Sequence, residues 1–179
     1  TAPVTATITV PTASNNCPGN SKTFTITVNP TADVDQPSNQ VLCNAATTTA
    51  INFTGNVSGT IYNWTNSNTL IGLAASGVGN IPVFTAINNT GIPVTATITV
   101  TAEAFGCPGT SKTFTITVDP TPDVVQPRDQ ILCNAATVAP INFTGSVSNT
   151  VYTWTNSNTS IGLAANGTGD ITSFTGTNN

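Results

Sequence analysis

The side chains that usually carry enzyme chemistry are scarce in this sequence. The chain of 179 residues contains no histidine, and it has seven acidic residues and four cysteines. Histidine is the commonest general base and metal ligand, and serine needs such a base to act as a nucleophile. A structural zinc site needs four ligands, usually cysteine and histidine. Each half of this chain supplies only two cysteines and no histidine. The sequence therefore predicts a protein that is not an enzyme, with no cofactor and no catalytic or metal-binding residues.

Four aspartates lie in two proline-containing segments, which raises the question of calcium. Asp33 and Asp35 belong to the first segment, and Asp119 and Asp123 belong to the second. Calcium takes six or more oxygen ligands, usually from several carboxylates. The first segment has two aspartates separated by one residue, and the second segment lacks this pair because Val125 stands in place of the second aspartate. We therefore expect solvated linkers here, with calcium binding as the alternative.

The composition indicates a folded protein that binds no nucleic acid and does not insert into a membrane. Charged residues are 6% of the chain, against about 25% in an average globular protein. Apolar residues are 38%, which is enough to build a core. The three basic residues, Lys22, Lys112 and Arg128, are too few to neutralise a phosphate backbone. The sequence also lacks an apolar run of about 18 residues, the length needed to cross a bilayer.

The strongest signal in the sequence is an internal repeat with a period of 90 residues. When the chain is aligned with itself at this offset, without a gap, 59 of 89 positions are identical. The aligned pairs include Cys17 with Cys107, Cys43 with Cys133, and Trp64 with Trp154. Repetition at a fixed period is typical of small structural units stacked along a chain.

Two prolines divide the chain into one complete repeat and two partial ones. Pro30 and Pro120 open proline-containing linkers, which are expected to be extended and semi-rigid. We predict that residues 31–120 form a complete module. Residues 1–30 are then the C-terminal strands of a preceding module, and residues 121–179 are the N-terminal part of the following one. Joining the last residue to the first nearly recreates an internal passage, so the chain resembles one unit of a repeating polymer; an arbitrary boundary is the alternative.

The pattern within one module predicts about seven short strands and an all-β fold. In residues 93–100 and 112–118, apolar residues alternate with threonine, and the glycines and proline between them predict a hairpin. Such strands, with a tryptophan on the third, are typical of an immunoglobulin-like β-sandwich, in which Trp64 and its counterpart Trp154 fill the core. The remaining strands are expected at residues 38–43, 47–54, 60–66, 69–73 and 81–87, and one helical turn is the alternative for the segment that contains Gly72, Gly77 and Gly79.

Several motifs together resemble the PKD-like repeats of large surface adhesins of Bacteroidota, including the gliding-motility adhesins. These motifs are WTNSNT, IGLAASG, GCPGT and TFTITVDP, and the resemblance covers the whole chain in both copies. It implies export by the type IX secretion route and an extracellular position on the cell surface, in filaments.

The cysteines are expected to form disulfide bonds in such an extracellular setting. Four cysteines allow three pairings, and Cys43 and Cys107 belong to the same module, so a bond between them is the first choice. The partners of Cys17 and Cys133 then lie in neighbouring modules. If the segment before Cys43 is fully extended, this residue reaches the far end of the module, and the bonds run between modules instead.

The sequence as a whole favours a mechanical function. We predict a structural repeat that forms the shaft of a long cell-surface adhesin filament and serves adhesion or gliding. Its partners are neighbouring copies of the same repeat, which complete one another head to tail, either within one polypeptide or by strand donation between chains. The alternative is a module that binds carbohydrate or ice through the regular threonine hydroxyls of the predicted hairpin.

Overall fold

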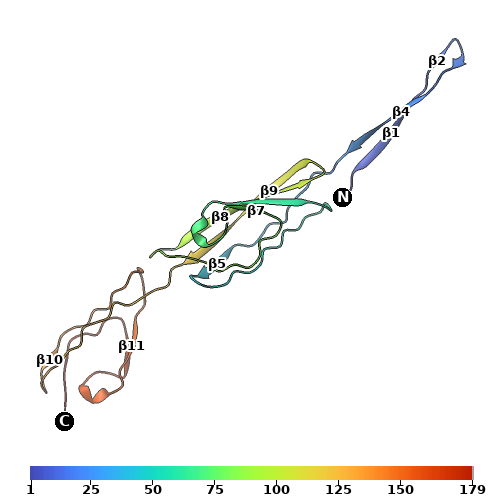
Figure 1. Ribbon diagram of the computed structural model, residues 1–179. Coiled ribbons are helices and arrows are strands. Elements are labelled where there is room, and N and C mark those ends of the chain that lie inside the picture. The colour runs from blue at the N-terminus through green and yellow to red at the C-terminus, as the bar shows by residue number, and fades with distance from the viewer. Residues whose placement is uncertain (179) are drawn as a thin grey trace. The chain divides into compact units, whose positions relative to one another are not determined.

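The computed structural model describes residues 1–178 and is nearly all β (Figure 1). The chain divides into two compact units, one of Thr1–Asn88 with Val94–Val118 and one of Asn89–Pro93 with Asp119–Asn179. No helix within residues 1–178 is long and apolar enough to cross a membrane. The elements are β1 (Val4–Val10), β2 (Ala13–Ser14), β3 (Cys17–Pro18), β4 (Lys22–Val28), β5 (Gln40–Cys43), β6 (Ile61–Asn66), η1 (Thr69–Ile71), β7 (Ser76–Val78), β8 (Val94–Ala104), β9 (Cys107–Asp119), β10 (Thr137–Val138), β11 (Thr153–Thr155), η2 (Thr159–Ile161), β12 (Asn166–Thr168) and β13 (Phe174–Thr175).

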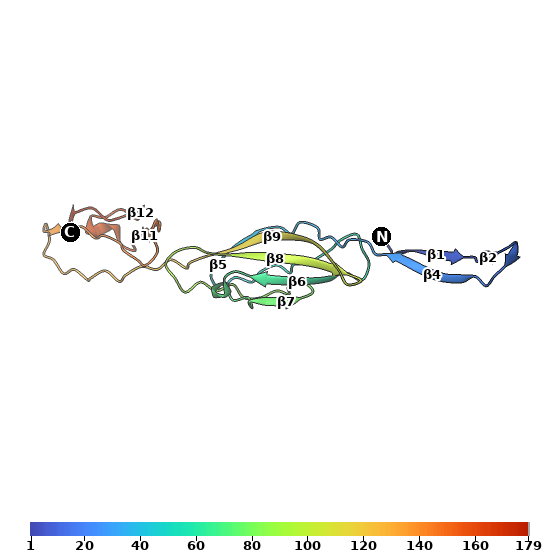
Figure 2. The same cartoon turned by 90° about the horizontal axis from the view of Figure 1, so that it is seen from above.

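A five-stranded sheet with the order β5-β9-β8-β6-β7 forms one layer of the first unit (Figure 2). The long strands β8 and β9 pair as an antiparallel hairpin, which confirms the predicted one. Side chains of successive strand residues point to opposite faces, and along β8 the even-numbered residues from Val94 to Ala104 are buried. The hairpin turns at Phe105 and Gly106, both with positive φ, which is the geometry of a tight two-residue turn.

The second layer of the first unit consists of extended segments that pair only at isolated bridges. Thr47 bridges Thr85, and Ile51 bridges Ile81, where the sequence had predicted continuous strands. Ile51, Phe53, Ile81 and Ala86 from this layer join the buried faces of β6, β8 and β9 in one apolar core. Two layers around one core are consistent with a β-sandwich.

The segment predicted as a solvated linker is part of this core. Ala32 and Val34 are 0% and 3% exposed. The backbone N–H of Thr110 donates to the carbonyl oxygen of Ala32, and the side chain of Gln36 donates to that of Thr113. The linker prediction was therefore wrong for residues 32–36, because alternate apolar side chains dock this stretch beside β9. We call residues 32–88 with 94–118 the closed module.

Residues 4–28 form a second hairpin with the same register as β8–β9. Val4 pairs with Val28 and Val10 with Lys22, at the positions where Val94 pairs with Val118 and Val100 with Lys112. The turn again has two residues with positive φ, here Asn15 and Asn16. We call residues 4–28 the free hairpin, since every residue of its strands is exposed.

The second unit repeats the local geometry of the closed module up to the point where β8 would begin. Strands β11 and β12 place Trp154 opposite Gly167, as β6 and β7 place Trp64 opposite Gly77. Ile141 bridges Ile171, η2 follows β11, and β10 pairs with β13. We call residues 119–178 the open module.

Candidate interaction surface

The free hairpin presents an apolar face to solvent. Phe24 and Ile26 on this face are 51% and 52% exposed, whereas their counterparts Phe114 and Ile116 in the closed module are 2% and 0% exposed. The same contrast holds for Val4, Ile8, Val10 and Val28 against Val94, Ile98, Val100 and Val118. A continuous apolar strip of this kind on a small protein usually marks an interaction site.

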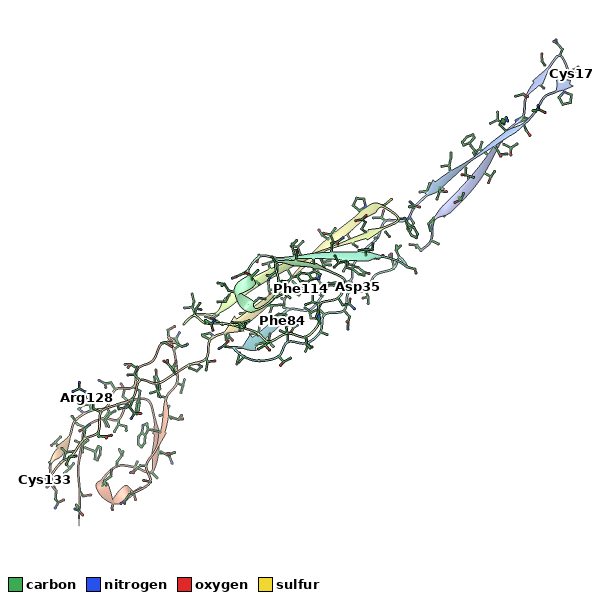
Figure 3. The ribbon with its side chains drawn as sticks, in the orientation of Figure 1. Cys17, Asp35, Phe84, Phe114, Arg128 and Cys133 are labelled. Carbon is green, nitrogen blue, oxygen red and sulfur yellow. The ribbon has the colours of Figure 1, made fainter. Side chains whose placement is uncertain are left out.

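The open module contains an apolar groove of about 460 Å³. Arg128 and Asn158 are among the polar residues at its margin, and the cysteine at position 133 also borders it (Figure 3). The apolar side chains that line the groove are Leu132, Val138, Ile141, Ile161, Leu163 and Phe174. A second hollow of about 440 Å³ is lined by Phe143, Tyr152 and Trp154, among others.

The groove exposes side chains whose counterparts are buried in the closed module. Ile161 is 41% exposed, whereas Ile71 is completely buried. Val124, which lines the second hollow, is 55% exposed, whereas Val34 is 3% exposed. In the closed module these positions belong to the core that includes the buried faces of β8 and β9. The groove is therefore the part of a core that a hairpin of this type covers.

The two tryptophans lie on equivalent strands in different surroundings. Trp64 is 7% exposed within the core of the closed module, and Trp154 is half-buried and lines the second hollow of the open module. Each indole ring covers the α-carbon of a glycine on the neighbouring strand. A β-carbon added to Gly77 would stand 2.3 Å from Cζ2 of Trp64, and one added to Gly167 would stand 2.2 Å from Cζ2 of Trp154.

Replacing Gly77 with alanine should destabilise the closed module. The new methyl group must displace the Trp64 ring, and overpacking of a formed core typically costs about 1 to 3 kcal/mol. Urea unfolding followed by tryptophan fluorescence measures the change. Gly79→Ala is the control for space, because no atom lies within 4 Å of its added β-carbon, although its positive φ carries a smaller backbone cost. Equal losses would show that the indole does not rest on Gly77.

The predicted disulfide between Cys43 and Cys107 is not formed, and all four cysteines are free. Cys107 begins β9, whereas Cys43 lies beside the other end of that strand. The side chain of its neighbour Asn44 accepts a hydrogen bond from the backbone N–H of Asn88. The side chain of Asn88 in turn donates to the carbonyl oxygen of Val118, near the end of β9. Eleven residues of strand span about 35 Å, and a disulfide needs α-carbons within about 7 Å. Cys17 lies at the tip of the free hairpin (Figure 3).

The acidic side chains hold loops rather than gather into a cluster. Oδ1 of Asp33 accepts from the backbone N–H of Asn56 at 2.7 Å, and Oδ2 of Asp35 accepts from the Thr54 hydroxyl at 2.6 Å. Burial of the Tyr62 ring, followed by the charges of these two aspartates, raises the pKa of Tyr62. Within residues 1–178, no three histidine, cysteine or acidic side chains are grouped so that they could hold a metal ion.

The carboxylate of Asp123 should titrate at low pH. Hydrogen bonds from the backbone N–H and the hydroxyl of Ser146, at 2.6 and 2.8 Å, hold its pKa below the ordinary value of 3.8. A lowered pKa means that this contribution to stability is present above about pH 4 and is lost as pH falls through the folded-state value. Carbon-detected NMR of the carboxyl group measures the midpoint. Ser146→Ala should raise it, and a midpoint at or above 3.8 in the unmodified chain would contradict this geometry.

The comparisons with protein families and with curated proteins identify no relative. No protein-family model matches the chain, and no curated protein shows significant similarity to it. The function is therefore inferred from the two surfaces described above.

Proposed function

We propose that this chain is a structural segment of an extracellular filament, in which immunoglobulin-like β-sandwich modules follow one another to form a shaft. The observation that carries the proposal is the hairpin built twice, 90 residues apart and in one register. One copy closes a core and the other does not. A chain that carries the last strands of one sandwich, a whole sandwich and the first part of a third supplies consecutive units of a linear array.

The surface chemistry supports a shaft position outside the cell. Threonine occupies the exposed face of the β8–β9 hairpin, and charged residues are only 6% of the chain. Neutral hydroxyls keep such a surface hydrated without creating a strong field that would attract charged partners. The resemblance to PKD-like repeats of Bacteroidota surface adhesins agrees with a role in adhesion or gliding.

Single-molecule stretching of fused copies tests the shaft function. Fusions with increasing numbers of the 90-residue repeat should unfold in equal steps, one for each module, and each step should release roughly 300 Å of chain. The contour length before unfolding should grow linearly with the number of repeats. Fusions that collapse into one globule, with no regular steps, would overturn the proposal.

A second candidate function rests on the paired threonines. The hydroxyls of Thr95 and Thr117 lie 2.9 Å apart across the closed-module hairpin, and Thr5 and Thr27 repeat this pair on the free hairpin. Regular hydroxyl rows of this kind could bind ice or carbohydrate. Thermal hysteresis measurements and a glycan array test it, and a shaft without a ligand predicts no signal in either.

A further inference from the structure

We propose that the pairing of residues 32–44 with β9 is the contact that resists tension when the shaft is stretched. We call residues 32–44 the docked segment. Within it, the side chains of Gln36 and Asn39 hold the segment to the strand. This inference deepens the proposed shaft function and rests on it, because it names the hydrogen bonds that keep a module folded under load.

The docked segment runs in the same direction as β9. At one end, the backbone N–H of Thr110 donates to the carbonyl oxygen of Ala32 at 3.2 Å. At the other end, β5 lies next to β9 in the sheet, and Asn88 links Asn44 to Val118 through two hydrogen bonds of 2.8 and 2.7 Å. Residue numbers therefore rise together along the two segments, which is a parallel arrangement.

Two amide side chains make the connection between these ends. The side chain of Gln36 donates to the carbonyl oxygen of Thr113 at 2.8 Å. The backbone N–H of Thr115 donates to Oδ1 of Asn39, also at 2.8 Å. Pro37 lies between the two amides and has no N–H to contribute to a backbone ladder. The side chains thus take the place of backbone pairing along this part of β9.

The direction of the docked segment decides how tension acts on these bonds. The chain enters the closed module just before Ala32 and leaves it after β9. Tension along the chain therefore pulls the start of the docked segment and the end of β9 in opposite directions. Because the two run parallel, this pull slides one past the other and stretches all the hydrogen bonds between them at once. Bonds that must break together resist a force better than bonds that break one after another.

The apolar side chains of the docked segment add to this resistance. Ala32 and Val34 are 0% and 3% exposed, and both belong to the core. Sliding the segment along β9 would draw these side chains out of the core and expose them to water, which is unfavourable. Hydrogen bonds and core contacts therefore oppose the same movement.

The second copy of the repeat keeps the chemistry of the two amide positions. Gln126 stands at the position of Gln36, and Asp129 stands at the position of Asn39. A carboxylate oxygen can accept the same backbone N–H, and a charged acceptor forms the stronger hydrogen bond. The position between them changes from serine to Arg128, so the variation here spares the residues that bind β9.

Optical tweezers test the load-bearing role in the full chain, with serine at the four native cysteine positions. Handles attached through Thr31→Cys and Pro122→Cys stretch the closed module along the chain. Gln36→Ala combined with Asn39→Ala should raise the unfolding rate at a fixed force at least about tenfold, because two hydrogen bonds are lost. Ser38→Ala, at an exposed position between them, is the matched control and should leave the rate within about twofold.

A second pair of handles separates resistance to tension from general stability. Ser58→Cys and Glu103→Cys pull β6 away from β8, a load that does not cross the docked segment. In this direction the double alanine variant should change the unfolding rate by less than about twofold. Equal acceleration in both directions would assign the two amides a merely structural role and overturn the proposal, as would an unchanged rate along the chain.

The conservative variant Asn39→Asp identifies the hydrogen bond itself. It keeps an oxygen that accepts from Thr115, so its unfolding rate along the chain should stay close to that of the unmodified protein. Asn39→Ala lacks this oxygen and should unfold faster, and equal rates for the two variants would contradict the assignment. Regular unfolding steps in fused repeats would still support the shaft in that case, so the two proposals can fail separately.

Discussion

Replacing Phe114 with alanine is expected to lower the free energy of unfolding of the closed module by about 3 to 5 kcal/mol. Phe114, which Figure 3 labels, is 2% exposed. Its ring centroid lies 6.5 Å from that of Phe53 in the opposite layer. Removing the ring loses its transfer free energy and leaves a cavity between the layers, which the hydrogen-bonded strands cannot close. Urea unfolding at low protein concentration, followed by tryptophan fluorescence, measures the loss.

Phe24→Ala is the matched control, because Phe24 lies in the same sequence, SKTFTITV, on the free hairpin. This side chain is 51% exposed, so its removal should cost at most about 1 kcal/mol in the monomer. Equal losses for the two variants at low concentration would show that both hairpins cover a core within one chain. That result would contradict the distinction between the closed module and the free hairpin.

Replacing Ile71 with aspartate should unfold the closed module. Ile71 is completely buried in η1 and belongs to the core. A carboxylate there has no positive partner among the core side chains, and burying it should cost about 4 kcal/mol or more, a large part of the stability of a small domain. Loss of the slowly exchanging amide protons of β8 and β9 in hydrogen-exchange NMR would report the unfolding.

Ile161→Asp makes the same change in the open module, where the side chain is 41% exposed. The closed module should keep its stability, and the open module should change little in the monomer, because the charge can remain in water. A loss of stability in the open module equal to the loss that Ile71→Asp causes in the closed module would contradict the difference in burial between the two side chains.

The alternation of apolar residues with threonine was enough to predict the central hairpin. Its strands extend further than predicted, through residues 101–104 and 107–111, because the turn forms at Phe105 and Gly106. Phenylalanine rarely adopts positive φ, so this turn gives little signal in the sequence. Residues 47–54 and 81–87 have strand-like composition but form only isolated bridges, since pairing depends on neighbours that a local pattern does not contain.

One error came from reading the first proline-containing segment as a linker, and another came from pairing Cys43 with Cys107 because they belong to the same module. Ala32 and Val34 alternate with aspartates, a strand-like signal that the nearby prolines obscured. The docking of this segment carries the chain along β9, and this displacement separates Cys43 from Cys107. The candidate surface was only partly predictable. The alignment of the 90-residue repeats predicted that residues 121–179 form only part of a module. The exposed fractions of the side chains that line the groove depend on three-dimensional packing and could not be predicted.

Hydrogen-exchange NMR of the unmodified chain tests most directly whether only one of its two hairpins closes a core. We expect slow amide exchange in Val94–Val100 and Lys112–Val118, and fast exchange in Val4–Val10 and Lys22–Val28, whose residues are all exposed. Equal protection of the two hairpins would contradict it.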